Sequence, residues 1–384
     1  MKRFAIRAPY TWARLDKMRR LFNWLRSFFA SPRARWLVLG LFVTQAIVLA
    51  VVVQPGTPPD ELNHIKFIEF YANHSLSPIF NHQQPTYNLG DKTREVDYLY
   101  HYLLSLVYRV LPLAAGAKYI VLRLFSIALG VATFFTIGAV ARRLHLSEAA
   151  TTVGLLVLTN LPMVLMMSAA INNDAPVWLG VALAMLLLLR LWEKPSWPDL
   201  LLLAEIIVVG GLVKRTMLPF NIIFAVLGLI IFLRAYRSLV RWPRHIDWRI
   251  VAVVVVLLVS TGLAVERIGG NLLRYHNPSP SCEQVQGVAP CSVFWANVRS
   301  RNQAALATQP MIPIPLFAIF WFATSLFNIV DIQTQGWHHE VMPASWLPWL
   351  LGIMLCAGII YGLYCDARSF RLDVNARHRV YITV

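Results

Sequence analysis

Long apolar runs alternate with short polar stretches along most of the chain. Apolar runs of about twenty residues have the length that a helix needs to cross the hydrocarbon core of a bilayer. The period-two alternation that marks half-exposed strands is absent. We therefore predict an all-α polytopic membrane helix bundle with about eight or nine membrane helices. The predicted spans cover residues 36–53, 118–141, 149–167, 175–191, 200–213, 217–233 and 250–265, with further apolar runs at 315–330 and 346–364.

Composition and charge agree with a membrane protein. Hydrophobic residues make up 57% of the chain and charged residues only 14%, whereas a soluble domain carries about 25% charged residues. The net charge of +16 is concentrated near the N-terminus and between apolar runs, where the positive-inside rule expects it. The positive charge therefore indicates orientation in a bilayer, and we expect no nucleic-acid partner.

The first 35 residues are strongly basic. They hold ten Lys or Arg and one acid, Asp16, with apolar residues at helical spacing. This pattern predicts an amphipathic cytoplasmic segment on an anionic lipid surface. No small-residue cleavage site follows the first apolar run, so a signal peptide is not expected. We expect residues 36–384 to form one transmembrane domain of a multi-pass protein in a bacterial plasma (inner) membrane, with its N-terminus in the cytoplasm.

Two longer polar segments are expected on the outer face, at about 54–117 and 266–310. The first contains a predicted helix that ends near residue 74 and an aromatic amphipathic helix at 98–110. The second of these helices is too short to cross the bilayer, so we expect it on the outer surface. The later segment contains Cys282 and Cys291. A disulfide closing a small loop is the better interpretation on an oxidising face, and two free thiols are the alternative.

Two acidic residues follow the first span almost directly. Three prolines precede Asp60 and Glu61, stop the helix and favour an extended turn. Because a new helical pattern begins at about Glu61, His64 lies within one turn of both carboxylates. Carboxylates and a histidine at the mouth of a membrane helix are costly unless they serve a purpose. The simpler alternative is a helix N-cap, for which Asp is a favoured residue.

Further polar residues lie at the outer ends of other predicted spans. Asn173 and Asp174 join the third and fourth spans, and Lys214 and Arg215 join the fifth and sixth. Taken singly, Asp174 is explained as a helix cap, and the two basic residues as side chains that reach the interface. Taken together with Asp60, these residues are expected to meet in one cavity at the outer membrane surface.

The order and placement of these motifs resemble the integral-membrane glycosyltransferases of the GT-C class. That class includes the lipid A aminoarabinose transferases and the protein O-mannosyltransferases. Its members have an acidic motif after span one, a second acidic residue after span three, a Lys after span five and a larger outer loop after span seven. Asp60-Glu61, Asn173-Asp174 and Lys214-Arg215 match these features, although Arg215 replaces a small residue. A related uncharacterised bacterial membrane family has Pro-Asp-Glu followed by His, and His64 fits that pattern.

The resemblance implies transfer of a sugar from a polyprenyl-phosphate donor to a glycan, lipid or protein acceptor on the outer face. Asp60 is suited to act as a general base, and Lys214 and Arg215 carry the charge that a donor phosphate needs. The expected catalytic residues are Asp60, Glu61 and Asp174, and the expected substrate-binding residues are His64, Asn173, Lys214 and Arg215.

Other interpretations of the same residues stay open. Asp60 and Glu61, with His64 or Asp174, could instead hold a divalent cation such as Mg²⁺ or Mn²⁺. The chain could also be a transporter or flippase for a lipid-linked or anionic substrate. Transporters commonly show internal repeats and charges near the midplane, and neither feature is evident in this sequence. A third possibility is a non-catalytic membrane protein of glycan assembly.

Overall fold

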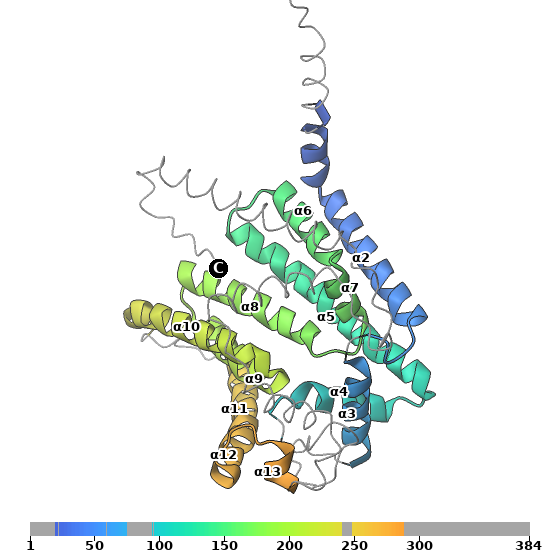
Figure 1. Cartoon of the computed structure of the whole chain (residues 1–384). Coiled ribbons are helices and arrows are strands. Elements are labelled where there is room, and N and C mark those ends of the chain that lie inside the picture. The colour runs from blue at the N-terminus through green and yellow to red at the C-terminus, as the bar shows by residue number, and fades with distance from the viewer. Residues whose placement is uncertain are drawn as a thin grey trace, which may run out of the picture. The chain divides into compact units, whose positions relative to one another are not determined.

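The computed structural model describes residues 20–21, 23–58, 60–74, 94, 96–239 and 248–287 (Figure 1). The described residues form helices and connecting turns, with no strand among them. This confirms the predicted all-α helix bundle. The first nineteen residues, residue Cys291 and the apolar runs at 315–330 and 346–364 lie outside the described residues. The basic N-terminal segment and the C-terminal spans therefore stay predictions.

Five described helical stretches are long and apolar enough to cross a membrane. They correspond to the first, second, fourth, sixth and seventh predicted spans. The fifth predicted span is the shorter helix α9 (Trp197–Val213). Its N-cap is Ser196, whose side chain accepts a hydrogen bond from the backbone N–H of Asp199. Three of the stretches are α2 (Pro32–Val52), α5 (Ala115–Arg143) and α8 (Asp174–Glu193). The other two cover most of α10 (Leu218–Leu239) and most of α11 (Trp248–Ala264).

The third predicted span is broken, which corrects the prediction of one continuous helix at 149–167. It consists of α6 (Glu148–Thr159) and α7 (Pro162–Ala169), which are bent by 68° relative to each other. Pro162 has no backbone N–H and cannot continue the helical hydrogen-bond ladder. At the break, the side-chain amide of Asn160 donates to the carbonyl oxygen of Leu156 at 2.8 Å.

The seventh span continues as a helix beyond residue 265, where the sequence predicted an outer loop. A π-helical turn, η2 (Val265–Gly269), joins α11 to α12 (Gly270–Tyr275). Arg267 and Asn271 are fully buried in this extension, so the side that carries them faces protein, whereas Leu272 and Leu273 on it are exposed. The predicted loop begins only at His276, which has a left-handed φ of 53°. A short helix, α13 (Cys282–Gln286), follows with a capping box from Ser281.

Two short helices follow α2 and lie where the sequence predicted them. They are α3 (Glu61–His74) and α4 (Leu99–Val110). The two helices pack against each other, and α4 also contacts α5 and α9. Tyr98, just before α4, and Tyr100 and Tyr102 within it are buried against neighbouring helices.

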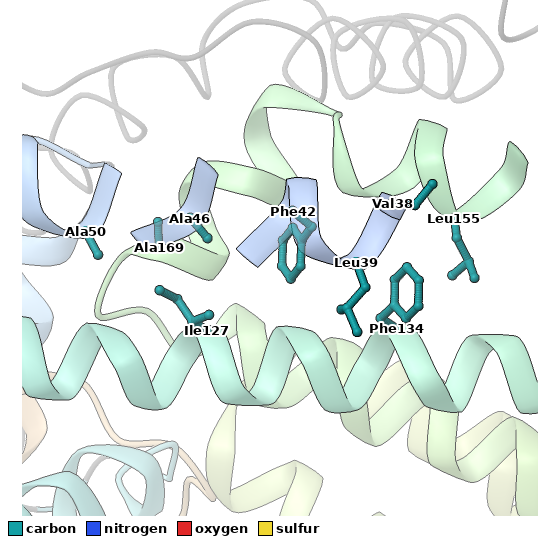
Figure 2. Close-up of a cluster of buried hydrophobic side chains, with 9 residues drawn as sticks. All are labelled: Val38, Leu39, Phe42, Ala46, Ala50, Ile127, Phe134, Leu155 and Ala169. Atoms are coloured by element: carbon teal, nitrogen blue, oxygen red, sulfur yellow. The ribbon is translucent and has the colours of Figure 1, made fainter. Parts of the chain in front are cut away.

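An apolar core joins the first two spans. Leu39, Phe42 and neighbouring side chains of α2 face Ile127 and Phe134 of α5 (Figure 2). A Cβ atom at Gly130 would lie 2.9 Å from Cζ of Phe42. The missing side chain therefore allows the two helices to approach closely. This packing determines where the chain leaves α2 and enters the turn that carries Asp60.

The antiparallel packing of α8 against α9 brings the start of α8 and the end of α9 to one end of the bundle. Figure 1 shows α8 beside both α5 and α9. The start of α8 lies close to the end of α9, and so Asp174 lies near Lys214. The described residues outside Leu161–Met163 belong to one compact unit. A second unit contains Leu161–Met163 and residues beyond 310, and only those three residues are described.

Candidate active site

A buried ion pair lies beside the start of α3. Nε of Arg123 donates to Oε1 of Glu61 at 2.8 Å, and Nη2 donates to Oε2 at 2.6 Å. The two side chains are 1% and 0% exposed. Two backbone N–H groups donate to the same carboxylate. The N–H of Ile171 donates to Oε1 at 2.9 Å, and the N–H of Gly56 donates to Oε2 at 2.8 Å. Each carboxylate oxygen of Glu61 thus accepts two hydrogen bonds.

The same arginine holds the end of α2. Nη1 of Arg123 donates to the carbonyl oxygens of Ala50 and Val53, both at 2.7 Å, and Nη2 donates to that of Gln54 at 3.3 Å. The last carbonyls of a helix have no partner within the helix, and here the guanidinium supplies one. The pair with Glu61 therefore ties together the end of α2, the start of α3 and the segment before α8.

Asp60 lies on the turn that this network holds. Its side chain is exposed, and its φ of 59° is in the left-handed region. Its carbonyl oxygen accepts the backbone N–H of Asn63 at 2.9 Å and of His64 at 3.1 Å, which begins α3. A non-glycine residue in this conformation persists only where its surroundings hold it. The two adjacent carboxylates are therefore in opposite environments, since Asp60 faces solvent and Glu61 is enclosed.

Asp174 and Lys214 form a second ion pair, with Nζ of Lys214 at 2.5 Å from Oδ1 of Asp174. The side chains are 23% exposed for Lys214 and 31% for Asp174. Asp174 is the first residue of α8, and its backbone N–H donates to Oδ1 of Asn172 at 2.8 Å. The amide of Asn173 donates to the carbonyl oxygen of Val213 at 3.2 Å. Asn172 thus supports the start of α8, Asn173 holds that start beside the end of α9, and the Asp174 carboxylate contacts the Lys214 ammonium group.

The two ion pairs lie at the same end of the helix bundle. Ile171 contacts Glu61 and is three residues before Asp174. Tyr100 of α4 is buried near both carboxylates, with its hydroxyl 3.4 Å from Oγ of Ser126. Burial raises the pKa of the Tyr100 hydroxyl, so this group stays protonated. The starts of α3 and α8, and hence Asp60 and Asp174, therefore lie at one end.

Arg215 connects this end of the bundle to the two segments that the sequence predicts on the outer face (the outer segments). Its Nη1 donates to Oγ of Ser279 at 2.9 Å, and its Nε lies 3.6 Å from Oδ1 of Asp97. Asp97 precedes α4 and Ser279 follows α12. Arg215 is on the short 3₁₀ turn η1 (Arg215–Met217), directly after Lys214. Two adjacent cations therefore have different anchors, one on α8 and one on the outer segments.

A further set of polar residues surrounds the π-helical turn, and sequence reasoning missed it. Nη1 of Arg94 lies 2.7 Å from Oε1 of Glu266, and its Nε donates to Oδ1 of Asn271 at 2.7 Å. The guanidinium of Arg267 lies 4.1 Å from the ring centroid of Tyr98. π-Helical turns are frequent at functional sites. The available signal was the charged pair just beyond the seventh apolar run, which was interpreted as the start of a loop.

His64 lies in a buried contact with a second histidine. Its Nδ1 is 2.7 Å from Nε2 of His101, and the two rings stack with centroids 5.0 Å apart. His101 is on α4, so this contact joins α3 to α4. The sequence predicted a substrate-binding role for His64, and the structure places its ring against α4.

Asp60, Glu61 and His64 do not fit a divalent cation as arranged. Both carboxylate oxygens of Glu61 face the guanidinium of Arg123, which would repel a cation. Nδ1 of His64 is engaged with His101. Within the described part of the chain, no three His, Cys, Asp or Glu side chains are grouped to hold a metal ion. Cys291 lies outside the described residues, so the Cys282–Cys291 disulfide stays a prediction.

Arg123 is the clearest residue that sequence reasoning overlooked. It lies within the second apolar run, at residues 118–141. An ionisable residue inside a membrane span is expensive and signals a specific partner. That signal was present, but the partner, Glu61, is 62 residues away in the chain. Only the packing of α5 against the end of α2 reveals it.

A comparison with protein families supports the resemblance inferred from the motifs. The family described as dolichyl-phosphate-mannose-protein mannosyltransferase matches residues 98–264. This segment runs from α4 to the end of α11 and contains Arg123, Asp174, Lys214 and Arg215. The match confirms the resemblance to GT-C glycosyltransferases and supports a multi-pass membrane glycosyltransferase of that type. No curated protein and no solved structure matches the chain.

Proposed function

We propose that this chain transfers a sugar from a polyprenyl-phosphate donor to an acceptor hydroxyl on the outer face of the membrane. The main support for the proposal is the ion pair of Asp174 and Lys214, which is partly exposed at one end of the helix bundle. It lies within the segment that resembles the mannosyltransferase family. A polyprenyl-phosphate sugar has an apolar tail for the bilayer and an anionic phosphate for such a boundary position.

Lys214 is proposed to bind the donor phosphate. Its ammonium group has three donors, and one of them faces Asp174. Charge-assisted hydrogen bonds from the others suit phosphate oxygens. As the sugar–phosphate bond breaks, negative charge grows on the leaving phosphate, and a fixed cation stabilises it. Asp174 orients the ammonium group, and Arg215 supplies a second cation beside it, held by Ser279 and Asp97.

Asp60 is proposed as the general base. Its exposed carboxylate accepts the proton of the acceptor hydroxyl while the hydroxyl oxygen forms a bond to the anomeric carbon. The sugar–phosphate bond breaks at the same carbon, and its electron pair leaves with the polyprenyl phosphate. The proton ends on Asp60 and the sugar on the acceptor. The network of Glu61 and Arg123 holds the backbone turn of Asp60, so we assign Glu61 a positioning role.

We propose that Asn173 and His64 position the helices that carry the site. Asn173 anchors the α8 start to the backbone of Val213, the residue before Lys214. His64 joins α3 to α4 through His101. Both contacts set the spacing between the two helix starts that carry Asp60 and Asp174. The substrate is then expected to lie between exposed carboxylates and cations rather than against His64.

The charge distribution supports an outer location for the site. Arg33 and Arg35 lie at the start of α2, and Arg142 and Arg143 at the end of α5. Both ends are opposite the Asp60 turn, and basic residues favour the cytoplasmic side. A bacterial plasma membrane with a cytoplasmic N-terminus is the setting proposed. The acceptor is proposed to be a glycan, a lipid or a protein.

Transfer of radiolabel from a lipid-linked sugar in membranes that contain the full chain tests this proposal. Asp174→Asn and, separately, Asp60→Asn are expected to lower transfer by about 100-fold or more. Glu193→Gln is the matched control, because Glu193 ends α8 and pairs with Arg143 at the other end. Undiminished transfer in both site variants would contradict the mechanism. Uptake of substrate into proteoliposomes with no covalent product would identify a transporter instead.

A further inference from the structure

A cavity lies at the other end of the bundle from Asp174 and Lys214. Its volume is about 350 Å³, and its walls come from the start of α2, the last turns of α5 and the start of α6. Its lining includes the charged residues Arg35, Arg142 and Glu148 and the aromatic residues Trp36 and Phe135. Nothing in the proposed transfer reaction uses these residues.

The cavity contains more positive than negative charge. Nη2 of Arg35 pairs with Glu148, which leaves one carboxylate for two guanidinium groups. Nε of Arg35 is buried and has no hydrogen-bond partner among the residues that the structure describes. Arg142 likewise forms no ion pair within that part of the chain. A buried donor without a partner is unfavourable. An anion between the two guanidinium groups would give Nε of Arg35 a partner and would give the exposed Arg142 a counter-charge.

One wall of the cavity is apolar and open to its surroundings. Trp36 and Phe135 meet edge to face with ring centroids 6.0 Å apart. Trp36 is 64% exposed. Tryptophan at the end of a membrane helix commonly lies at the level of the lipid headgroups. The aromatic pair therefore offers a surface for the upper part of an acyl chain, next to a site for an anion.

The position of the cavity along α5 places it at a membrane boundary. Arg123, beside the candidate active site, and Arg142, beside the cavity, are both on α5. Their separation of nineteen residues corresponds to about 28 Å along the helix, which is close to the thickness of the hydrocarbon core of a bilayer. Along α5, the cavity therefore lies about one hydrocarbon-core thickness from the candidate active site.

We propose that this cavity binds the phosphate of an anionic phospholipid, with an acyl chain against Trp36 and Phe135. Basic cavities between membrane helices are suited to anionic headgroups. A choline headgroup would add a positive charge to a site that already has an excess, so zwitterionic phosphatidylcholine is a poor ligand. A bound lipid would contact α2, α5 and α6 at once and would stabilise their packing at this end of the bundle. This inference does not depend on the proposed transfer reaction.

Native mass spectrometry of the purified full chain tests the proposal. Protein reconstituted with equal amounts of phosphatidylglycerol and phosphatidylcholine is expected to retain phosphatidylglycerol preferentially. Arg142→Gln is expected to reduce this retention about five- to tenfold, and Arg142→Lys is expected to keep most of it. Arg143→Gln is the matched control, because Arg143 is the next residue but faces Glu193 outside the cavity. It removes the same charge and is expected to leave retention unchanged.

Three results would overturn the proposal. Equal losses in Arg142→Gln and Arg143→Gln would show general attraction of the basic surface to anionic lipid. Displacement of the lipid by millimolar inorganic phosphate would show a free phosphate site. Equal retention of phosphatidylcholine would show that the charge has no part in binding. Trp36→Ala, which keeps both guanidinium groups, is expected to weaken lipid retention while leaving a normal gel-filtration profile.

Discussion

Two ion pairs lie near the same end of this protein and differ in almost every physical respect. Glu61 and Arg123 are buried, joined by two hydrogen bonds, and further satisfied by backbone groups from three chain segments. Asp174 and Lys214 are partly exposed and are joined by one contact. The first pair therefore has no capacity for another ligand, whereas the second retains donors and acceptors that a substrate can use.

The energetics of the two environments explain this division. Removing two charges from water is costly, and hydrogen bonds must satisfy the remaining lone pairs and protons. An exposed pair contributes only about 0–1 kcal/mol and exchanges partners easily. A phosphate could thus replace part of the Asp174–Lys214 contact at little cost. A charged residue at a membrane boundary therefore acts in structure or in binding according to how fully its partners enclose it.

The largest expected effect is on folding, from Glu61→Gln. The substitution leaves Arg123 as a buried charge without its counter-ion, and we expect a loss of about 3–5 kcal/mol in the free energy of unfolding. Thermal unfolding in detergent, followed by size-exclusion chromatography, measures the loss. Glu193→Gln, in a pair whose carboxylate side chain is 48% exposed, is expected to lose less than about 1 kcal/mol. Similar losses of unfolding free energy in the two variants would contradict the claim that the buried pair matters more for stability than the exposed pair.

The next largest effect concerns activity alone. Lys214→Gln is expected to lower kcat/KM for the lipid-linked donor by about 100-fold, because the leaving phosphate loses a fixed cation. Its free energy of unfolding is expected to change by less than about 1 kcal/mol. Steady-state transfer assays and thermal unfolding on the same preparations separate the two quantities. A loss of stability comparable to that in Glu61→Gln would assign Lys214 a structural role instead.

Double-mutant cycles sharpen the comparison further. For Asp174→Asn with Lys214→Gln, the coupling in unfolding free energy is expected to be about 0.2–1 kcal/mol. For Glu61→Gln with Arg123→Gln, the coupling is expected to exceed about 2 kcal/mol, because the double variant removes both buried charges. Chemical unfolding of the four single and two double variants gives both values. Equal coupling energies for the two pairs would show that the buried pair contributes no more to stability than the partly exposed pair.

The smallest expected effect is on the pH dependence of stability, from Tyr100→Phe. Burial raises the folded-state pKa of Tyr100 above the ordinary 10.0. Its contribution to stability is therefore complete below pH 10 and is lost as the pH rises above that value, where only the unfolded hydroxyl ionises. The variant is expected to lose stability less steeply than the wild type between pH 10 and 11, with a change of about 1 kcal/mol or less at pH 7. Melting temperatures across this range measure it.

Much of the helical framework followed from local pattern. The bounds of α3 and α4, and the apolar runs that became α2, α5, α8, α9 and α10, agree closely with the helices that the structure contains. Two errors have specific causes. The prediction ignored Pro162, which breaks the third span, and it ended the seventh span at the first charges, although Arg267 and Asn271 are buried in its helical extension.

The sequence alone specifies the helices, because apolar length, prolines and caps act within a few residues of one another. It also brings Asp60, Asp174 and Lys214 to helix ends, because a chain that crosses a bilayer repeatedly must turn there. Only the tertiary structure decides that Glu61 is enclosed while the adjacent Asp60 faces solvent. The physical reason is that burial of a charge depends on a partner such as Arg123, which packing supplies from another helix.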